Sequence, residues 1–262
     1  MTGTDPILLV GAQRSGTTAL AAALSQGIAS VGGCFTINGK LPYFLRRWWT
    51  APDADAHHLR SDEVAHALGR IPELDDGEGA WLNRAREALL ASAHRAGDTK
   101  VSIVDEVRRV CAEAYGREPW GDKYNEYLLD LPWLHAMFPD ARWVFLVREP
   151  AEAVASMIAW RHDKPWNPRD ARAASTKWAC WTSRWLAFRE AVEPRRRLEI
   201  DYAALCEGRH DRLSEFVGVD LTPFLTNFRC RTGARPWAPL DPDATEVRAA
   251  FVRLGLLTNS GA

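Results

Sequence analysis

The sequence has few of the residues and patterns that mark metal centres and disulfide scaffolds. Its five cysteines are widely spaced and odd in number, so we expect neither a C-x-x-C metal site nor a complete disulfide framework, and we predict buried or half-buried free thiols. The seven histidines show no H-E-x-x-H pattern, and the adjacent His57 and His58 would face different directions on a helix or a strand. We therefore predict no metal site.

The sequence also lacks a strong net charge and any long apolar run. A net charge of −1 and a pI near 6.7 exclude a global field that would attract nucleic acid or an anionic membrane, so any basic site must be local. The first residues, M-T-G-T-D-P, contain no cationic or apolar targeting segment, and no later stretch approaches the length of a membrane span. These absences predict a cytoplasmic protein without a nucleic-acid partner.

The composition that remains is ordinary for a globular protein. Hydrophobic residues make up 47% of the 262 residues and charged residues 26%, which suits one large domain over residues 1–262. Strand patterns alternate with helical patterns, which predicts a three-layer α/β/α domain with a mainly parallel sheet. The expected strands lie at residues 7–10, 30–37, 101–104, 144–147 and 198–200, and the clearest expected helices at 61–68, 80–94, 151–160, 169–192 and 243–254.

The first strand runs directly into a glycine-bounded loop and a helix. In P-I-L-L-V-G-A-Q-R-S-G-T-T the loop from Gly11 to Gly16 separates an apolar run from an Ala/Leu-rich segment of high helix propensity. Backbone N–H groups of such a loop can turn inward and meet the positive end of the helix dipole, which makes a site for a nucleotide 5′-phosphate. The alternative is an ordinary strand-turn-helix with serine and threonine caps. The spacing favours a nucleotide-binding domain of the P-loop type.

One position departs from the loop that binds nucleoside triphosphates. In G-x-x-x-x-G-K-[ST] the lysine after the second glycine reaches the β- and γ-phosphates, but here that position is Thr17. The nearest cation is Arg14 within the loop, and Thr17 and Thr18 add two hydroxyls at the helix start. A P-loop kinase or phosphotransferase is therefore the weaker alternative, and a nucleotide with less charge on its 5′ side is favoured.

A second candidate phosphate site follows the strand at residues 144–147. Arg148 stands at the end of that strand, where open parallel sheets bind their ligands, and Ser156 lies two helical turns further on. An arginine with paired donors and a hydroxyl can together hold a phosphate. The alternative for the arginine is a salt bridge at the strand end with Glu149 or Glu152.

Two aromatic stretches each have a structural and a functional interpretation. Trp178, Trp181 and Trp185 recur on one face of the helix at 169–192, which is more typical of a core than of a ligand platform. The segment from Tyr43 to Trp49 fits either a packed surface helix or a wall of an acceptor pocket equally well.

Three stretches together resemble the sulfotransferases that use 3′-phosphoadenosine 5′-phosphosulfate (PAPS). R-S-G-T-T at 14–18 is similar to the family's loop for the 5′-phosphosulfate, and V-R-E-P-A-E-A-V-A-S at 147–156 is similar to its strand and helix for the 3′-phosphate. The stretch at 121–142, which begins G-D-K-Y-N-E-Y and ends F-P-D-A-R, is similar to the G-D-K-T-P block of many bacterial members. The resemblance covers residues 6–160 and continues weakly through Asp201 and Tyr202 to the arginine-rich loop that begins at Arg229.

The resemblance implies an activity and roles for individual residues. A sulfuryl group would pass from PAPS to a hydroxyl or amine of a small-molecule acceptor, leaving 3′-phosphoadenosine 5′-phosphate (PAP) and requiring no metal. Arg14 and Lys123 would be the catalytic residues, Arg148 and Ser156 would hold the 3′-phosphate, and Tyr202 would lie near the adenine. The 5′ contacts fall on Gln13, Arg14, Ser15, Gly16, Thr17 and Thr18, and Arg229, Arg231 or Arg235 would close over the 3′-phosphate.

The general base is not where the resemblance would put it. Residues 31–41 contain no carboxylate, and Asn125 stands where many relatives carry a histidine. An acceptor that needs no strong base is one alternative, and a catalytically silent nucleotide-binding module is another. The open candidates for the base are Asp122, Glu126, Asp105, Glu106, His57 and His58.

The acceptor is constrained only by composition. Twelve tryptophans suit an apolar or ring-bearing small molecule, although most of them also suit a core. The Ala- and Arg-rich composition suggests a bacterial source, and a bacterial metabolite, a lipid or a sugar is therefore favoured over a protein tyrosine.

Overall fold

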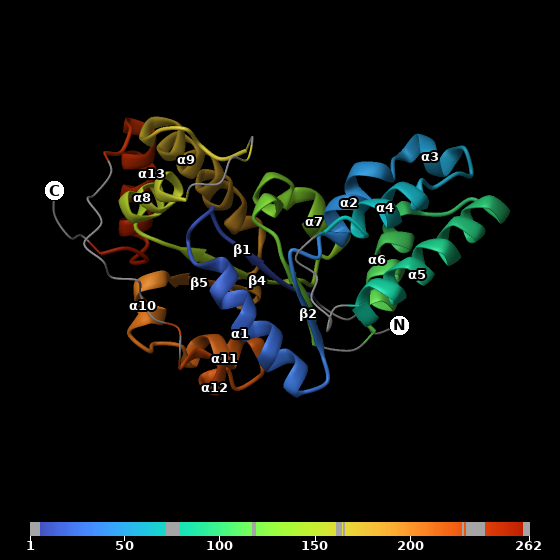
Figure 1. Ribbon diagram of the computed structural model, residues 1–262, viewed down its shortest axis with the longest axis horizontal. Coiled ribbons are helices and arrows are strands. Elements are labelled where there is room, and N and C mark those ends of the chain that lie inside the picture. The colour runs from blue at the N-terminus through green and yellow to red at the C-terminus, as the bar shows by residue number, and fades with distance from the viewer. Residues whose placement is uncertain are drawn as a thin grey trace. The chain divides into compact units, whose positions relative to one another are not determined.

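The strands form one five-stranded parallel sheet. The computed structural model describes residues 6–71, 79–116, 119–160, 164, 166–226, 228 and 239–258. The strand order is β2-β3-β1-β4-β5, in which β2 pairs in parallel with β3 and β4 pairs in parallel with β5 (Figure 1). The predicted α/β fold with a mainly parallel sheet is confirmed. The strands are β1 (Ile7–Val10), β2 (Cys34–Ile37), β3 (Trp120–Lys123), β4 (Arg142–Val147) and β5 (Arg197–Asp201).

Helices occupy most of the chain between the strands. Several begin at a side-chain cap, since Ser102, Asp170 and Asp241 each accept a hydrogen bond from the backbone N–H three residues further on. The helices are α1 (Thr17–Ser30), α2 (Leu41–Trp48), α3 (Ala51–Asp55), α4 (Ser61–Leu68), α5 (Gly79–Asp98), α6 (Ile103–Tyr115), η1 (Asn125–Leu129), α7 (Leu131–Met137), α8 (Pro150–Ala159), α9 (Ala171–Phe188), η2 (Arg189–Ala191), η3 (Pro194–Arg196), α10 (Tyr202–Cys206), α11 (Asp211–Val217), α12 (Thr222–Leu225) and α13 (Pro242–Arg253).

One predicted strand is wrong and one observed strand was not predicted. The short apolar run at 101–104 predicts a strand, but Ser102 caps a helix and α6 begins at Ile103. The third strand is instead W-G-D-K at 120–123, whose four residues are all buried. Glycine, aspartate and lysine are rare in strands, so their burial by the neighbouring elements overrides a weak local propensity.

The described chain divides into two compact units. The first contains the described residues of Met1–Leu8, Leu24–Tyr124 and Pro132–Ala141, and the second those of Leu9–Ala23, Asn125–Leu131 and Arg142–Ala262. β1 and α1 each contribute residues to both units, while β2 and β3 belong to the first and β4 and β5 to the second.

The first unit is held partly by a buried ion pair between two helices. The Glu106 carboxylate of α6 is almost fully buried and accepts hydrogen bonds from the Ser92 hydroxyl at 2.6 Å and from Arg95 at 2.8 Å, both on α5. Burial alone would raise the pKa of Glu106, but the bonds from Arg95 and Ser92 outweigh it and hold the pKa below its usual value. Glu106 therefore joins α5 to α6.

The second unit is layered around β4 and β5. In Figure 1, α8, α9 and α13 lie on one side of these two strands, and α10, α11 and α12 lie on the other. Trp178 and Trp185 of α9 are fully buried, and Trp185 stacks on Phe145 of β4 with ring centroids 4.9 Å apart. Trp181 is 8% exposed. The prediction that these tryptophans belong to the core is confirmed.

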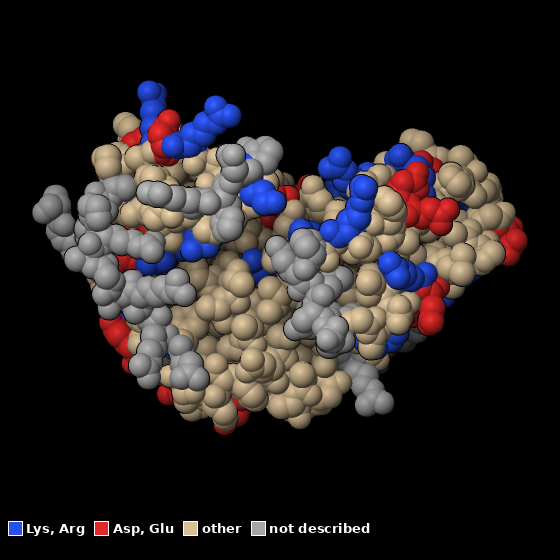
Figure 2. Space-filling view, in the orientation of Figure 1, with Lys and Arg blue, Asp and Glu red and all other residues tan. Residues whose placement is uncertain are grey.

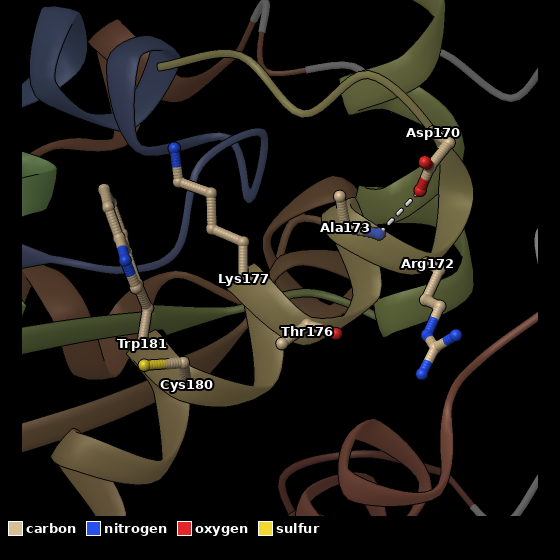
Figure 3. Close-up of a pocket in the computed structure, with 7 residues that line it drawn as sticks. All are labelled: Asp170, Arg172, Ala173, Thr176, Lys177, Cys180 and Trp181. Carbon is tan, nitrogen blue, oxygen red and sulfur yellow. Dashed lines mark hydrogen bonds between the residues drawn. The ribbon is translucent and has the colours of Figure 1, made fainter.

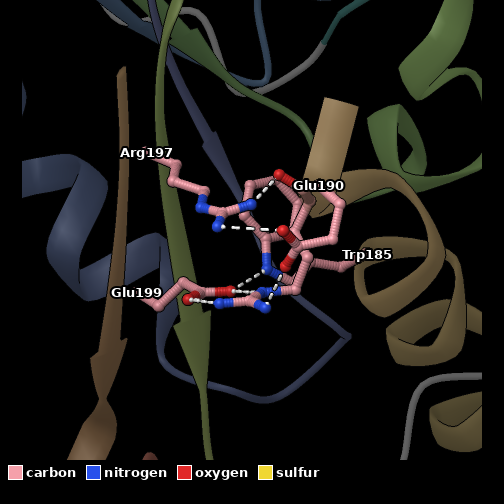
Figure 4. A network of polar contacts seen from close by, with 5 residues as sticks. Trp185, Glu190, Arg197 and Glu199 are labelled. Atoms are coloured by element: carbon pink, nitrogen blue, oxygen red, sulfur yellow. Dashed lines mark hydrogen bonds and ion pairs between the residues drawn. The ribbon is translucent and has the colours of Figure 1, made fainter. Parts of the chain in front are cut away.

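A polar network fixes the end of α9 to β5 (Figure 4). Glu199 of β5 accepts hydrogen bonds from the Trp185 indole at 2.6 Å and from two nitrogens of Arg189 at 2.7 and 2.8 Å. Arg197 lies 3.4 Å from a Glu190 oxygen. Burial favours protonation of Glu199, but the bonds from Arg189 and Trp185 outweigh it and lower the pKa of the carboxyl. The network orients α9, whose outer face is described below.

Two features of the cysteines differ from expectation. Cys206 is disulfide-bonded, so the prediction of free thiols is wrong for that residue. Cys34, Cys111 and Cys180 are free, but Cys180 is exposed rather than buried or half-buried. Odd numbers and wide spacing in a sequence carry no information about which two thiols the fold brings together.

The surface in view carries both signs of charge. Figure 2 shows lysine and arginine side chains interspersed with acidic ones, as a net charge of −1 suggests. Within the described residues, no helix combines the length and the apolarity that crossing a membrane requires.

Candidate active site

Two positions of the loop between β1 and α1 require glycine, Gly16 because of its backbone conformation and its neighbours, and Gly11 because of its neighbours alone. Gly16 has φ +93°, and a Cβ there would lie 2.5 Å from the ring of Tyr202. At Gly11 a Cβ would lie 2.6 Å from the carbonyl oxygen of Leu146 and 2.8 Å from the Thr17 methyl group. The loop is thus packed directly against β4 and the start of α10.

Asn125, the first residue of the 3₁₀ helix η1, stabilises this loop through hydrogen bonds. Its side-chain amide donates hydrogen bonds to the carbonyl oxygen of Gly11 at 2.6 Å and to the hydroxyl oxygen of Thr17 at 3.1 Å. In the sequence, Asn125 was notable only because many relatives have a histidine at that position. Nothing in the sequence indicated that it would hold the loop. The Thr17 hydroxyl therefore contacts the protein, in the place where a triphosphate-binding loop carries its lysine.

Ser15 contributes a polar atom without a protein partner. Its hydroxyl is buried and makes no hydrogen bond within the described part of the chain. Several buried polar atoms share this property, the Ser61 hydroxyl among them, but Ser15 is the one that lies in the glycine-bounded loop. In a loop whose N–H groups precede a helix, an oxyanion is the ligand that fits. The Ser15 environment therefore suits the phosphate that the sequence predicts.

The remaining loop residues differ in exposure. Arg14 and Thr18 are exposed, and Gln13 is half-buried. Arg14 has a positive φ of 64°, and its Nε donates a hydrogen bond to the Ser156 hydroxyl of α8 at 3.2 Å. Its guanidinium also lies 5.3 Å from the ring centroid of Trp160. Arg14, the catalytic candidate of the glycine-bounded loop, thus contacts Ser156, which was predicted to hold the 3′-phosphate.

Arg148 completes this cluster. Its Nη1 donates a hydrogen bond to the backbone oxygen of Arg14 at 3.2 Å, and its guanidinium lies 4.5 Å from the ring centroid of Tyr202. Its Nε also pairs with Glu152 at 2.9 Å, so the alternative salt bridge is present as well. The second unit therefore brings together Arg14, Arg148, Ser156 and Tyr202, which come from three separate stretches of the sequence.

Lys123 lies in the first unit at the end of β3. Its side chain is 3% exposed, and its ammonium donates a hydrogen bond to the side-chain oxygen of Asn38 at 3.1 Å. Asn38 has a positive φ of 62°, and its backbone N–H donates to the Lys123 carbonyl at 2.8 Å. The Lys123 ammonium and the Asn38 side chain therefore position each other at the end of β3.

Asp122 is occupied in shaping the same turn. Its carboxylate is fully buried and accepts hydrogen bonds from the Thr36 hydroxyl at 2.7 Å and from the backbone N–H groups of Gly39 and Lys40, each at 3.0 Å. These bonds satisfy both carboxylate oxygens. Asp122 therefore positions the turn after β2, which carries Asn38, and its oxygens are not placed to take a proton from an acceptor.

The other candidates for the base differ in their exposure and in their contacts. Glu106 is committed to the ion pair described above, and Asp105 is exposed on the first turn of α6. His57 and His58 are exposed, and the His57 ring contacts the Ala96 carbonyl at 3.1 Å. Burial lowers the pKa of Lys177, and Glu126, on η1, opposes that shift by attracting the Lys177 ammonium.

Two further sequence expectations concern the metal and the C-terminal arginines. Among the described residues, no three histidine, cysteine, aspartate or glutamate side chains gather as a metal site would require. Arg229, Arg231 and Arg235 lie outside the described residues.

Comparison with known proteins supplies the family. The sequence profile described as "Sulfotransferase family" matches residues 6–223, which is most of the chain and includes every element of this site. The chain belongs to the sulfotransferase family. It is a sulfotransferase-family enzyme, as the motifs at 14–18, 121–142 and 147–156 predict. None of the curated proteins matches it.

Solved structures place this sulfotransferase on a known fold. The sulfotransferase domain of the Synechococcus PCC 7002 olefin synthase is 21% identical, covers 100% of this chain and 92% of its own, and has a TM-score of 0.52. The sulfotransferase domain from the curacin biosynthetic pathway is 17% identical, with coverages of 95% and 98% and a TM-score of 0.56. Sulfotransferase STF1 from Mycobacterium tuberculosis H37Rv is 18% identical, with coverages of 95% and 77% and a TM-score of 0.50. These similarities support the fold.

Proposed function

We propose that this enzyme transfers a sulfuryl group from PAPS to a hydroxyl or amine of a small-molecule acceptor. The observation that carries the proposal is the contact between the two phosphate motifs, in which Arg148 donates to the backbone of Arg14 and Arg14 donates to Ser156. Two guanidinium groups and a hydroxyl, next to a glycine loop, suit a nucleotide with separate 5′ and 3′ phosphates better than one with a triphosphate chain.

The protein's groups divide between the two ends of the nucleotide. The loop N–H groups with the Ser15 hydroxyl hold the 5′ side, together with Gln13, Thr17 and Thr18. Arg148 and Ser156 hold the 3′-phosphate, and Arg148 then exchanges its contact with the half-exposed Glu152 for the stronger phosphate pair. Tyr202, whose ring lies against Gly16 and Arg148, bounds the adenine.

In this reaction the protein mainly positions the two reactants and stabilises the negative charge that develops on the leaving group. Transfer breaks the bond from sulfur to the 5′-phosphate oxygen, forms a bond from sulfur to the acceptor's oxygen or nitrogen, and releases the acceptor's proton. Arg14 and Lys123 stabilise the charge that the 5′-phosphate gains, as fixed cations do in phosphoryl transfer. Because the oxygens of Asp122 and Glu106 are engaged in structural bonds, the candidates for the base that stay open are Glu126, Asp105, His57 and His58.

A turnover assay tests the proposal. The enzyme is incubated with PAPS in the presence of a chelator and a mixed panel of phenols, sugars, hydroxylated lipids and amines, and the products are analysed by mass spectrometry. We expect one or more sulfated acceptors together with an equal amount of PAP. The matched reaction with ATP and Mg²⁺ should give no phosphorylated product. Phosphorylation with ATP, or PAP binding without transfer to any acceptor, would favour a phosphotransferase or a silent binding module instead.

A further inference from the structure

The outer face of α9 carries a groove that the donor site does not use. It is an open groove with a volume of about 590 Å³ (Figure 3). Lys177 and Trp181 stand on one side of it in the figure, and Asp170 and Arg172 on the other. Its lining residues are Asp170, Arg172, Ala173, Thr176, Lys177, Cys180 and Trp181.

Lys177 is the unusual group in this groove. Its ammonium lies 4.7 Å from the ring centroid of Trp181 and 5.6 Å from that of Trp166, and it donates a hydrogen bond to the Trp166 carbonyl at 2.8 Å. Within the described residues, no carboxylate lies within ion-pairing distance of it. Burial lowers the pKa of Lys177, and attraction to Glu126 opposes that shift. A desolvated cation without an ion pair favours an anionic ligand.

The other charges that line the groove are already engaged. Asp170 accepts a hydrogen bond from the Ala173 N–H at 2.8 Å as the cap of α9. Arg172 is attracted to Asp241, whose pKa it helps to lower, and Asp241 also accepts from the Thr176 hydroxyl at 2.7 Å. Lys177 is therefore the lining cation best able to hold a ligand's charge.

Aromatic contacts connect the groove with the donor loop. The Arg14 guanidinium lies over Trp160, the rings of Trp160 and Trp166 are 5.0 Å apart, and Trp166 contacts Lys177. Trp166 is 44% exposed, so its indole is accessible to a ligand. All these residues belong to the second unit. A flat molecule on these indoles would lie within a few side chains of the loop.

We propose that this groove binds the acceptor, and that the acceptor is an aromatic alcohol with a carboxylate group. The carboxylate pairs with Lys177, and the ring packs mainly on the exposed indole of Trp166, which contacts Lys177 beside the groove. Trp181 lines the groove but offers only the small part of its surface that the core leaves exposed. This inference rests on the proposed function, because it names the acceptor class of the same enzyme. A charged hydrogen bond to a half-buried ammonium is worth about 1.5–3 kcal/mol, which corresponds to roughly ten- to a hundredfold in affinity.

Calorimetric titration with hydroxynaphthoate, in the presence of saturating PAP, tests the proposal. Its uncharged analogue hydroxynaphthamide is titrated in parallel. The variants are Lys177→Met, which keeps the stem and removes the charge, and Lys177→Arg, which keeps the charge. Lys100→Met is the matched control, since Lys100 is an exposed lysine of the first unit paired with Asp55. PAP affinity is measured for every variant.

We expect Lys177→Met to bind the naphthoate at least tenfold more weakly than the wild type, whereas Lys177→Arg and Lys100→Met retain binding. The amide should bind weakly to all four proteins, and PAP equally well to all four. Equal naphthoate affinity in the wild type and Lys177→Met, equal affinity for the amide, or no saturable binding would overturn the groove assignment. Failure of the wild type to bind PAP would instead contradict the proposed function.

Discussion

We expect Arg148→Ala to bind PAP about a hundredfold more weakly than the wild type, because a guanidinium bonded to a phosphate contributes roughly 1.5–3 kcal/mol. Its side chain is only 14% exposed, so solvent screens the contact little. ADP has no 3′-phosphate, and its affinity should change far less. Calorimetric titration of both nucleotides into both proteins measures the difference.

Two controls separate recognition of the 3′-phosphate from a structural role of Arg148. Glu152→Gln removes the carboxylate that competes for the Arg148 Nε, and PAP affinity should be kept or rise slightly. Thermal unfolding of each variant reports whether the fold is retained. An equal loss of ADP and PAP affinity in Arg148→Ala would mean that the arginine supports the loop through Arg14 rather than binding the 3′-phosphate.

Lys123→Met should lower kcat about a hundredfold to a thousandfold, which is the usual cost of removing one donor to a developing negative charge. Methionine keeps the stem of the side chain in its buried position, so the fold should tolerate the change. Because the proposed role of Lys123 is at the bridging oxygen during transfer, the affinity for PAP should fall by much less than kcat. Steady-state kinetics with PAPS, combined with PAP titration, separate the two quantities.

Asn38→Ala serves as the comparison for Lys123. Asn38 holds the ammonium through a neutral oxygen and carries no charge of its own, so its loss should cost kcat less than loss of the lysine. If Lys123→Met lowered PAP affinity as much as kcat, or left kcat unchanged, Lys123 would be a binding or structural residue.

The parts of the site that could be predicted are those with strong local patterns. The run at 7–10 followed by Gly11 and Gly16 fixes a strand, a tight turn and a helix by local sterics alone. The strand before Arg148 is buried on both faces. Its residues therefore form an uninterrupted apolar run, which is easily recognised in the sequence. The tryptophans of α9 likewise follow the helical period and form the core.

The parts that could not be predicted depend on contacts between distant segments. Asn125 stabilises the loop through bonds to residues more than a hundred positions away, and an asparagine in sequence gives no sign of such partners. The strand at 120–123 has polar residues because Asp122 is needed to bind the turn after β2 and Lys123 to contact Asn38. Local propensity therefore favoured the wrong segment at 101–104, where Ser102 begins a helix.

The measurement that tests the central claim most directly is a titration of the wild-type enzyme with PAP, ADP and ATP, without metal and again with Mg²⁺. We expect saturable binding of PAP, binding of ADP weaker by about a hundredfold because ADP lacks the 3′-phosphate that Arg148 and Ser156 hold, and no gain for ATP on adding Mg²⁺. Tighter binding of ATP than of PAP, or ATP binding that depends on Mg²⁺, would contradict the assignment of the two phosphate motifs and favour a phosphotransferase.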